Sequence, residues 1–267
     1  MLITNNKSIN RSYFTRMLDY CFSSFISIGV FFIFLSLWQI ANYYTSDFIL
    51  ANPQNVILKA LEIIKNYDEF DLIISLKRAF IGSFISLCLG IVLGIISYKF
   101  KTFLLFIKPI ISINLSIAPI AWVVLALFWF GFSDFSVIFV VIICTYAYTF
   151  SCTLNALNDI PKGLKDMAKI YKFSKKSLFI NLYLPFSLAH LLPASLISIS
   201  NAFKLTIMAE LLGANNGIGS KIADARSFLE NDVVLAYLLI CVVFLAAFEF
   251  LIIKNLELII YKDKTNV

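Results

Sequence analysis

Residues 155–185 read NALNDIPKGLKDMAKIYKFSKKSLFINLYLP, a long polar segment with six lysines inside an otherwise hydrophobic sequence. Its first half carries apolar residues at the spacing of one helix face, namely Ile160, Leu164, Met167, Ala168 and Tyr171. This spacing predicts a short amphipathic helix. Asn158 or Asp159 can cap that helix, and Pro161 suits its first turn, where the missing N–H would have no partner anyway.

The second half of the segment predicts another short helix. Ser174 can serve as its N-cap, and Phe173 and Leu178 flank that residue at the spacing of a hydrophobic staple. The chain then runs into Leu184 and Pro185. Residues 155–185 therefore predict a helix, a turn and a second helix at a membrane surface.

The rest of the 267-residue chain has the composition of an integral membrane protein. It is 60% hydrophobic and 14% charged, with 27 phenylalanines, and soluble domains do not reach such values. A helix needs about 20 apolar residues to cross the hydrocarbon layer. Six stretches of this kind predict an all-α protein with six transmembrane helices, at 22–41, 79–98, 109–131, 135–154, 186–212 and 233–253.

The lysines and arginines predict the orientation of these spans. They are most frequent before the first span, between the second and third, in residues 155–185 and after the last span. Because such segments stay on the cytoplasmic side, both termini and the 155–185 loop are predicted to be cytoplasmic. The expected organisation is a cytoplasmic segment 1–21, a transmembrane domain 22–257 and a cytoplasmic tail 258–267. The first span is expected to be a retained anchor, since no signal-peptide cleavage site follows it.

An amphipathic helix is expected outside the membrane between the first two spans. It would start at Asn52-Pro53, and its apolar residues Val56, Ala60, Ile63 and Ile64 follow at helical spacing. The acidic residues Asp68, Glu69 and Asp71 come next and are interpreted as a solvated face rather than an ion site.

The third span is unusual because it contains Pro109 and Pro119 together with Asn114 and Ser116. Proline frees backbone groups that then need other partners. A broken helix at this depth is therefore expected to be buried in protein or to lie beside a water-filled path.

The 155–185 segment resembles the cytoplasmic coupling loop of ABC importer permeases, the Glu-Ala-Ala loop. Asp166 stands at the position of the family's acid, Met167-Ala168 at its small pair, and Leu182 and Leu184-Pro185 at its end, all in register. The family's glycine position holds Lys172, which departs from the pattern. A lysine adopts the left-handed backbone of glycine only at some cost, so the turn is expected to differ or to be strained.

Two further runs are similar to one branch of that family, the permeases of the nitrate, sulfonate and taurine importer type. The fifth span ends in Ala-Glu-Leu-Leu-Gly-Ala at 209–214, followed by Gly-Ile-Gly at 217–219, and Lys204 stands six residues before the acid. The third span contains Ile-Ala-Pro at 117–119 and ends in Phe-Trp-Phe-Gly at 128–131.

The resemblance implies a type I ABC importer permease fold and a transport subunit with no chemistry or cofactor of its own. Its implied partners are a second copy of the chain, a cytoplasmic ATPase dimer that holds ATP and Mg²⁺, and an extracytoplasmic substrate-binding protein. The implied location is a bacterial inner membrane, and the implied cargo a small solute, with an anion such as nitrate, sulfonate or taurine favoured. Nucleic acid is not an expected partner.

The resemblance and the polar residues of the spans together give two sets of candidate site residues. The ATPase-coupling set is Asp166, Met167, Ala168, Lys172, Leu182, Leu184 and Pro185. The translocation-pathway set is Asn114, Ser116, Pro119, Asn201, Lys204 and Glu210. An ionisable group inside a span usually faces a cavity or a partner. The hypothesis is that Lys204 borders the pathway and Glu210 pins the end of its span to the following loop; the alternative is that both are packed or reach the membrane surface.

Two other classes of protein compete with this interpretation. A membrane-embedded enzyme is disfavoured by the single histidine, His190, and by the lack of a metal-binding spacing or a nucleophile with a nearby base. The five cysteines are scattered singly, as buried thiols are. A stand-alone carrier or channel remains the alternative, although the sequence shows no inverted repeat. No phosphate-binding loop occurs, so an energy source would have to lie on another chain.

Overall fold

The computed structural model describes residues 29–30, 32–33, 35–45, 50–66, 71–171, 173–174, 177 and 183–264; at 162, 165, 169, 184–190 and 251–264 it describes the backbone alone. Regular structure in these residues is helical, as the composition predicted. The long helices are α3 (Leu72–Lys99), α6 (Asp134–Asn158), α9 (Leu184–Gly213) and α11 (Asn231–Lys264). Shorter helices are α2 (Pro53–Lys65), α4 (Lys101–Ser116), α5 (Pro119–Phe130), α7 (Lys162–Ile170) and α10 (Ile218–Ser227).

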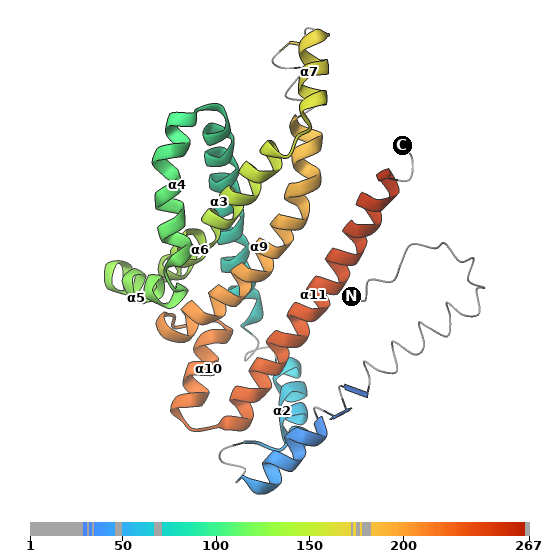
Figure 1. Cartoon of the computed structure of the whole chain (residues 1–267). Coiled ribbons are helices and arrows are strands. Elements are labelled where there is room, and N and C mark those ends of the chain that lie inside the picture. Colours follow the sequence, from blue (N-terminus) through green and yellow to red (C-terminus); the bar gives the residue numbers. More distant parts are fainter. Residues whose placement is uncertain are drawn as a thin grey trace, which may run out of the picture.

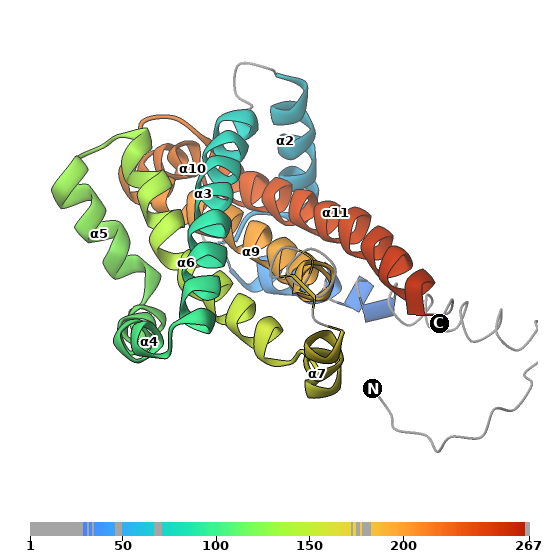
Figure 2. The same cartoon turned by 90° about the horizontal axis from the view of Figure 1, so that it is seen from above.

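The helices form an elongated bundle with two distinct ends. α3, α6 and α9 lie at its centre, with α4 and α5 on one side and α11 on the other (Figure 1, Figure 2). α7 stands at one end, and α2 and α10 lie at the opposite end (Figure 1). We call these the α7 end and the α10 end. In the predicted topology the α7 end would face the cytoplasm.

Four helical segments in the described part of the chain are long and apolar enough to cross a membrane: Leu72–Lys99, Asp134–Asn158, Leu191–Gly213 and Asn231–Phe250. They correspond to the second, fourth, fifth and sixth predicted spans. The third predicted span is two helices, α4 and α5, whose axes are bent by 98°. Residues 22–28, 31 and 34 of the first predicted span, 22–41, lie outside the described residues, so the count of six remains a prediction.

The break between α4 and α5 follows from Pro119. Helical geometry is disfavoured for the residue before a proline, and Ala118 is accordingly extended, with φ −62° and ψ 135°. Pro119 then starts α5, where its missing N–H is tolerated. Pro109, by contrast, lies inside α4. The predicted broken helix is confirmed, and the second of the two prolines sets its position.

α3 and α6 make the most extensive helix contact of the bundle. Three glycines on α3 allow it, because each has a side chain of α6 directly above its Cα. A Cβ built on any of them would come within 2.6–2.7 Å of the facing side chain, the pairs being Gly82 with Val141, Gly90 with Thr149, and Gly94 with Thr153. Close approach over small residues is how helices pack in membranes. The two helices therefore form one tightly packed pair along most of their length.

A second packed cluster lies at the α10 end, where α2 and α10 cover the start of α11. The helix predicted after Asn52 is confirmed as α2: the Asn52 side chain accepts a hydrogen bond from the Gln54 N–H (3.0 Å). Val56, Ala60 and Ile63 point into the cluster, whereas Ile64 is exposed. The short helix α10 follows directly after Gly217.

Candidate functional site

The α7 end carries the segment predicted to be a coupling loop. α6 continues through Asn158, with Asp159 as its C-cap, so the prediction that Asn158 or Asp159 caps the next helix was wrong. α7 follows at Lys162, and the Leu164 N–H bonds to the Pro161 carbonyl at 3.1 Å. The predicted amphipathic helix is present, and Pro161 directly precedes it instead of lying in its first turn.

The apolar stripe of α7 is divided between the bundle and solvent. Ile160 and Ala168 are buried, whereas Met167, Ile170 and Tyr171 are exposed, the last two at 78% and 69%. Asp166 is also exposed. α7 therefore presents an apolar and acidic surface that no described residue of the chain covers.

The turn after α7 ends that helix in a defined way. The Phe173 N–H bonds to the Ala168 carbonyl at 3.1 Å, the six-residue bond of a Schellman C-cap, which most often has glycine just before the donor. Ser174 accepts a hydrogen bond from the Ser177 N–H at 3.2 Å, which confirms the predicted N-cap. Lys172 and Leu182 lie outside the described residues. Leu184 and Pro185 begin α9, where only the backbone is described.

The candidate pathway residues fall on two separate helical regions. On α9, Asn201 and Lys204 are both exposed and stand three residues apart, so they share one face of the helix. At the α4–α5 break, Asn114 is buried, and Ser116 and Pro119 are exposed. The Ser116 hydroxyl donates to the Ser112 carbonyl at 2.9 Å. The structure brings together the residues within each group.

Glu210, the sixth candidate, is buried among residues of its own chain. Its carboxylate accepts hydrogen bonds from the Ser75 hydroxyl (2.6 Å), the Arg78 guanidinium (2.6 Å) and the Gly219 N–H (3.1 Å). These partners lie on α3 and α10. The contacts favour the anchoring role of the original hypothesis over a place beside an open pathway.

Arg78 extends this network to further elements. Besides Glu210, its guanidinium donates to the Asn216 carbonyl at 2.6 Å and pairs with Asp134 at the first turn of α6. The Ser75 hydroxyl also accepts from the Ile218 N–H (3.0 Å). α3, α6, α9 and α10 are thus held together by one arginine and its carboxylate.

The glycines after the acid are explained by the same network. Gly217 has φ 109°, and a Cβ on it would lie 2.5 Å from the Glu210 carboxylate. A Cβ on Gly219 would lie 2.5 Å from both the Glu210 Cβ and the Ile207 carbonyl. The Gly-Ile-Gly run therefore folds directly over the carboxylate, where any side chain would displace it.

Sequence reasoning missed Ser75, Arg78 and Asp134. Lys77 and Arg78 directly precede the predicted second span, 79–98, so the predicted topology places them outside the membrane. α3 begins at Leu72, seven residues before that span, so Arg78 lies inside a helix of the bundle. One signal in the sequence could have indicated Arg78. A carboxylate near the end of a span, such as Glu210, needs a cationic partner, and Arg78 is a cation near the end of another span.

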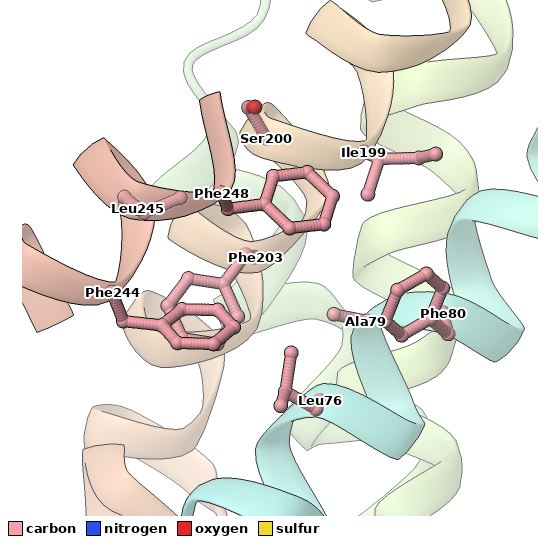
Figure 3. A pocket seen from close by; sticks show the side chains of 9 residues that line it. All are labelled: Leu76, Ala79, Phe80, Ile199, Ser200, Phe203, Phe244, Leu245 and Phe248. Atoms are coloured by element: carbon pink, nitrogen blue, oxygen red, sulfur yellow. The ribbon is translucent and has the colours of Figure 1, made fainter. Parts of the chain in front are cut away.

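A small cleft between α3, α9 and α11 shows no features of a solute site (Figure 3). Phe203, Phe244 and Phe248 face into it, and the Ser200 hydroxyl is the polar side-chain group of its lining. A permeating ion would gain almost nothing from such a surface.

The chain was then compared with known proteins. The sequence model of one family, described as "Binding-protein-dependent transport system inner membrane component", matches residues 86–254. The chain belongs to this family. The match covers α4–α6, the 155–185 segment, α9, α10, the second half of α3 and most of α11.

Individual relatives of this permease agree with its assignment to the family. The permease is 28% identical to the nitrate import permease protein NrtB of Synechococcus elongatus, over 72% of this chain and 73% of that protein. It is 27% identical to the taurine transport system permease protein TauC of Escherichia coli, over 79% of this chain and 80% of that protein. The alternative of a stand-alone carrier finds no support among these relatives.

The fold of the permease is also known from solved structures. A chain of the MetNI methionine ABC transporter, in inward-facing conformations, aligns with a TM-score of 0.60 and 18% identity, covering 68% of this chain and 91% of that chain. The permease therefore has the type I ABC importer fold, as its coupling-loop pattern predicted.

Proposed function

We propose that this permease moves a small anion, of the class of nitrate, sulfonates or taurine, into a bacterial cell through the inner membrane. Two copies of the chain would form the path. The observation that carries the choice of an anion is the exposed Lys204 in the middle of a span. The nitrate and taurine permeases among its relatives support the same class of cargo.

Lys204 lies about 14 Å from Gly213 at 1.5 Å per helical residue, close to the middle of a hydrocarbon layer about 30 Å thick. A lysine facing lipid at that depth costs about 3 kcal/mol or more. The exposed face of α9 that holds Asn201 and Lys204 is therefore proposed to face water or the second copy. A two-fold arrangement would bring two ammonium groups to the path, which favours an anionic cargo.

The α7 surface is the proposed docking site for a cytoplasmic ATPase dimer, which would hold ATP and Mg²⁺. Ile170 and Tyr171 supply exposed apolar area, and Asp166 a charge beside it. Met167 and Ala168, together with Lys172, Leu182, Leu184 and Pro185, complete the proposed coupling set. A substrate-binding protein would approach the opposite, α10 end.

Affinity purification of the tagged chain from its native membrane tests this proposal. We expect an ATPase to co-purify with the unaltered chain and to be lost with Asp166→Lys. Asp224→Lys, an exposed acid on α10 at the other end, is the matched control and should retain the ATPase. If no ATPase co-purifies with the unaltered chain in mild detergent, the importer function is contradicted. The stand-alone carrier would then be the better interpretation. Uptake of nitrate and taurine into proteoliposomes then tests the cargo.

A further inference from the structure

The loop that contains α7 is covalently joined to two of the three central helices. It leaves α6 after Asn158 and enters α9 at Leu184. α3 has no such connection, since it ends at Lys99, well before the loop. A motion of the loop can therefore reach α3 only through side-chain contacts.

Tyr98 and Tyr183 make one of these contacts, at the α7 end of the bundle. Tyr98 is the second-last residue of α3, and Tyr183 directly precedes α9. Their rings meet edge to face with centroids 5.9 Å apart and planes at 65°. An edge-to-face arrangement of this kind is a favoured contact of two aromatic rings.

Tyr183 is placed to move with α9. Its backbone is already helical, with φ −69° and ψ −43°, so it extends α9 by one residue toward the loop. Any displacement of the second half of the loop that shifts α9 shifts the Tyr183 ring as well. The contact then transfers that displacement to the end of α3.

α3 passes a displacement on because it is tightly packed against its neighbours. Gly90 and Gly94 seat Thr149 and Thr153 of α6 so closely that neither helix can slide along the other without clashes. At the other end of α3, Arg78 holds α6, α9 and the turn before α10. A shift at Tyr98 is thus carried by packed helices to the α10 end.

We propose that Tyr98 and Tyr183 are a positioning pair that makes α3 follow α9 when the cytoplasmic loop moves, and so links ATP hydrolysis to opening at the α10 end. This inference rests on the proposed function, since it needs the ATPase that the loop would bind. Neither tyrosine belongs to the α7 surface or to the α9 face around Lys204. The pair therefore affects the efficiency of energy transfer and leaves ATPase docking and cargo binding unchanged.

The test uses the whole importer, with its ATPase and binding protein, in proteoliposomes. ATP hydrolysis and uptake of taurine and nitrate are measured together for Tyr98→Leu, Tyr183→Leu and the double variant. Each single variant removes one ring and with it the edge-to-face contact. Since an aromatic pair contributes about 0.5–1.5 kcal/mol, we expect solute moved per ATP to fall roughly two- to tenfold. The rate of hydrolysis and the KM for solute should stay unchanged.

Two features separate this role from a structural one. The double variant should lose no more coupling than either single variant, because each single variant already removes the same ring contact. Tyr146→Leu on α6 is the matched control and should leave the ratio of uptake to hydrolysis unchanged. If the importer is active and both single variants keep the normal ratio of uptake to hydrolysis, the role of the tyrosine pair is overturned, and the proposed function still stands. No ATP-dependent uptake by the unaltered complex would instead overturn the proposed function.

Discussion

Arg78 and Glu210 form a buried ion pair of 2.6 Å between residues 132 positions apart in the chain. The exposed fraction of the Arg78 side chain is 5%, and that of Glu210 is 0%. The same guanidinium also pairs with Asp134, whose side chain is 74% exposed. One cation thus makes a buried and a solvated ion pair, and the two pairs are expected to differ in their contribution to stability.

Glu210→Gln should lower the stability of the bundle strongly. The substitution leaves the guanidinium of Arg78 buried without its carboxylate, and breaking a buried pair costs about 3–5 kcal/mol. Asp134→Asn breaks the solvated pair of the same arginine and should cost about 1 kcal/mol or less. Thermal unfolding of the detergent-purified variants measures both. Equal losses of stability in the two variants would show that the buried ion pair contributes no more to stability than the solvated pair.

Gly219→Ala should prevent normal assembly of the α10 end. The new methyl group would lie 2.5 Å from the Ile207 carbonyl, a backbone atom that cannot rotate away. Gly163→Ala is the matched control, since a Cβ there meets nothing within 4 Å and the site lies in helix α7. The control should be neutral or stabilise by about 0.5–1 kcal/mol. Expression level and melting temperature report the difference; a Gly219→Ala protein as stable as the control would contradict the proposed close contact.

Ile170→Glu should weaken ATPase capture without changing the stability of the permease. Ile170 is 78% exposed on α7, so a charge there perturbs no packing inside the chain. Loss of an apolar interface anchor costs about 2 kcal/mol, or more than tenfold in affinity. Phe228→Glu, at a 77% exposed position beyond α10, is the control. Titration of the purified ATPase against both variants decides whether α7 is the docking surface.

Lys204→Ala should raise the KM for anion uptake about tenfold, the effect of losing roughly 1.4 kcal/mol of attraction. Lys204→Arg keeps the positive charge and should retain most of the uptake. Because Lys204 is exposed on α9, neither variant should change the melting temperature. Initial rates over a range of nitrate and taurine concentrations give the KM. Uptake by Lys204→Ala at the normal KM would exclude the anion-attracting role.

The caps at Asn52 and Ser174 and the break in the third span were predictable because their causes are local. Asn52 caps α2, Ser174 accepts the bond of an N-cap, and Pro119 breaks the third span, each through its own backbone or a neighbour a few residues away. Apolar spacing likewise identified the buried residues of α2. These features depend on residue types at short separations, which the sequence displays directly.

The network around Glu210 was not predictable in the same way. The requirement of a carboxylate for a cation is general, but the choice of Arg78 depends on how α3 and α9 pack across 132 residues of chain. The glycines of α3 illustrate the same limit. Gly90 is small because Thr149 of α6 occupies the space above it, and nothing near Gly90 in the sequence indicates that neighbour.

The 98° bend between α4 and α5 has a consequence for how the protein is made. Ala118 offers no side-chain bond to the first turn of α5, so the helix ends at the break expose peptide groups. Lipid tails cannot satisfy those groups, whereas water in a shared path or a neighbouring copy can. If a second copy supplies those partners, as proposed above, a newly inserted chain keeps exposed peptide groups until it assembles, and we expect proteases to degrade the unassembled chain faster than the assembled one.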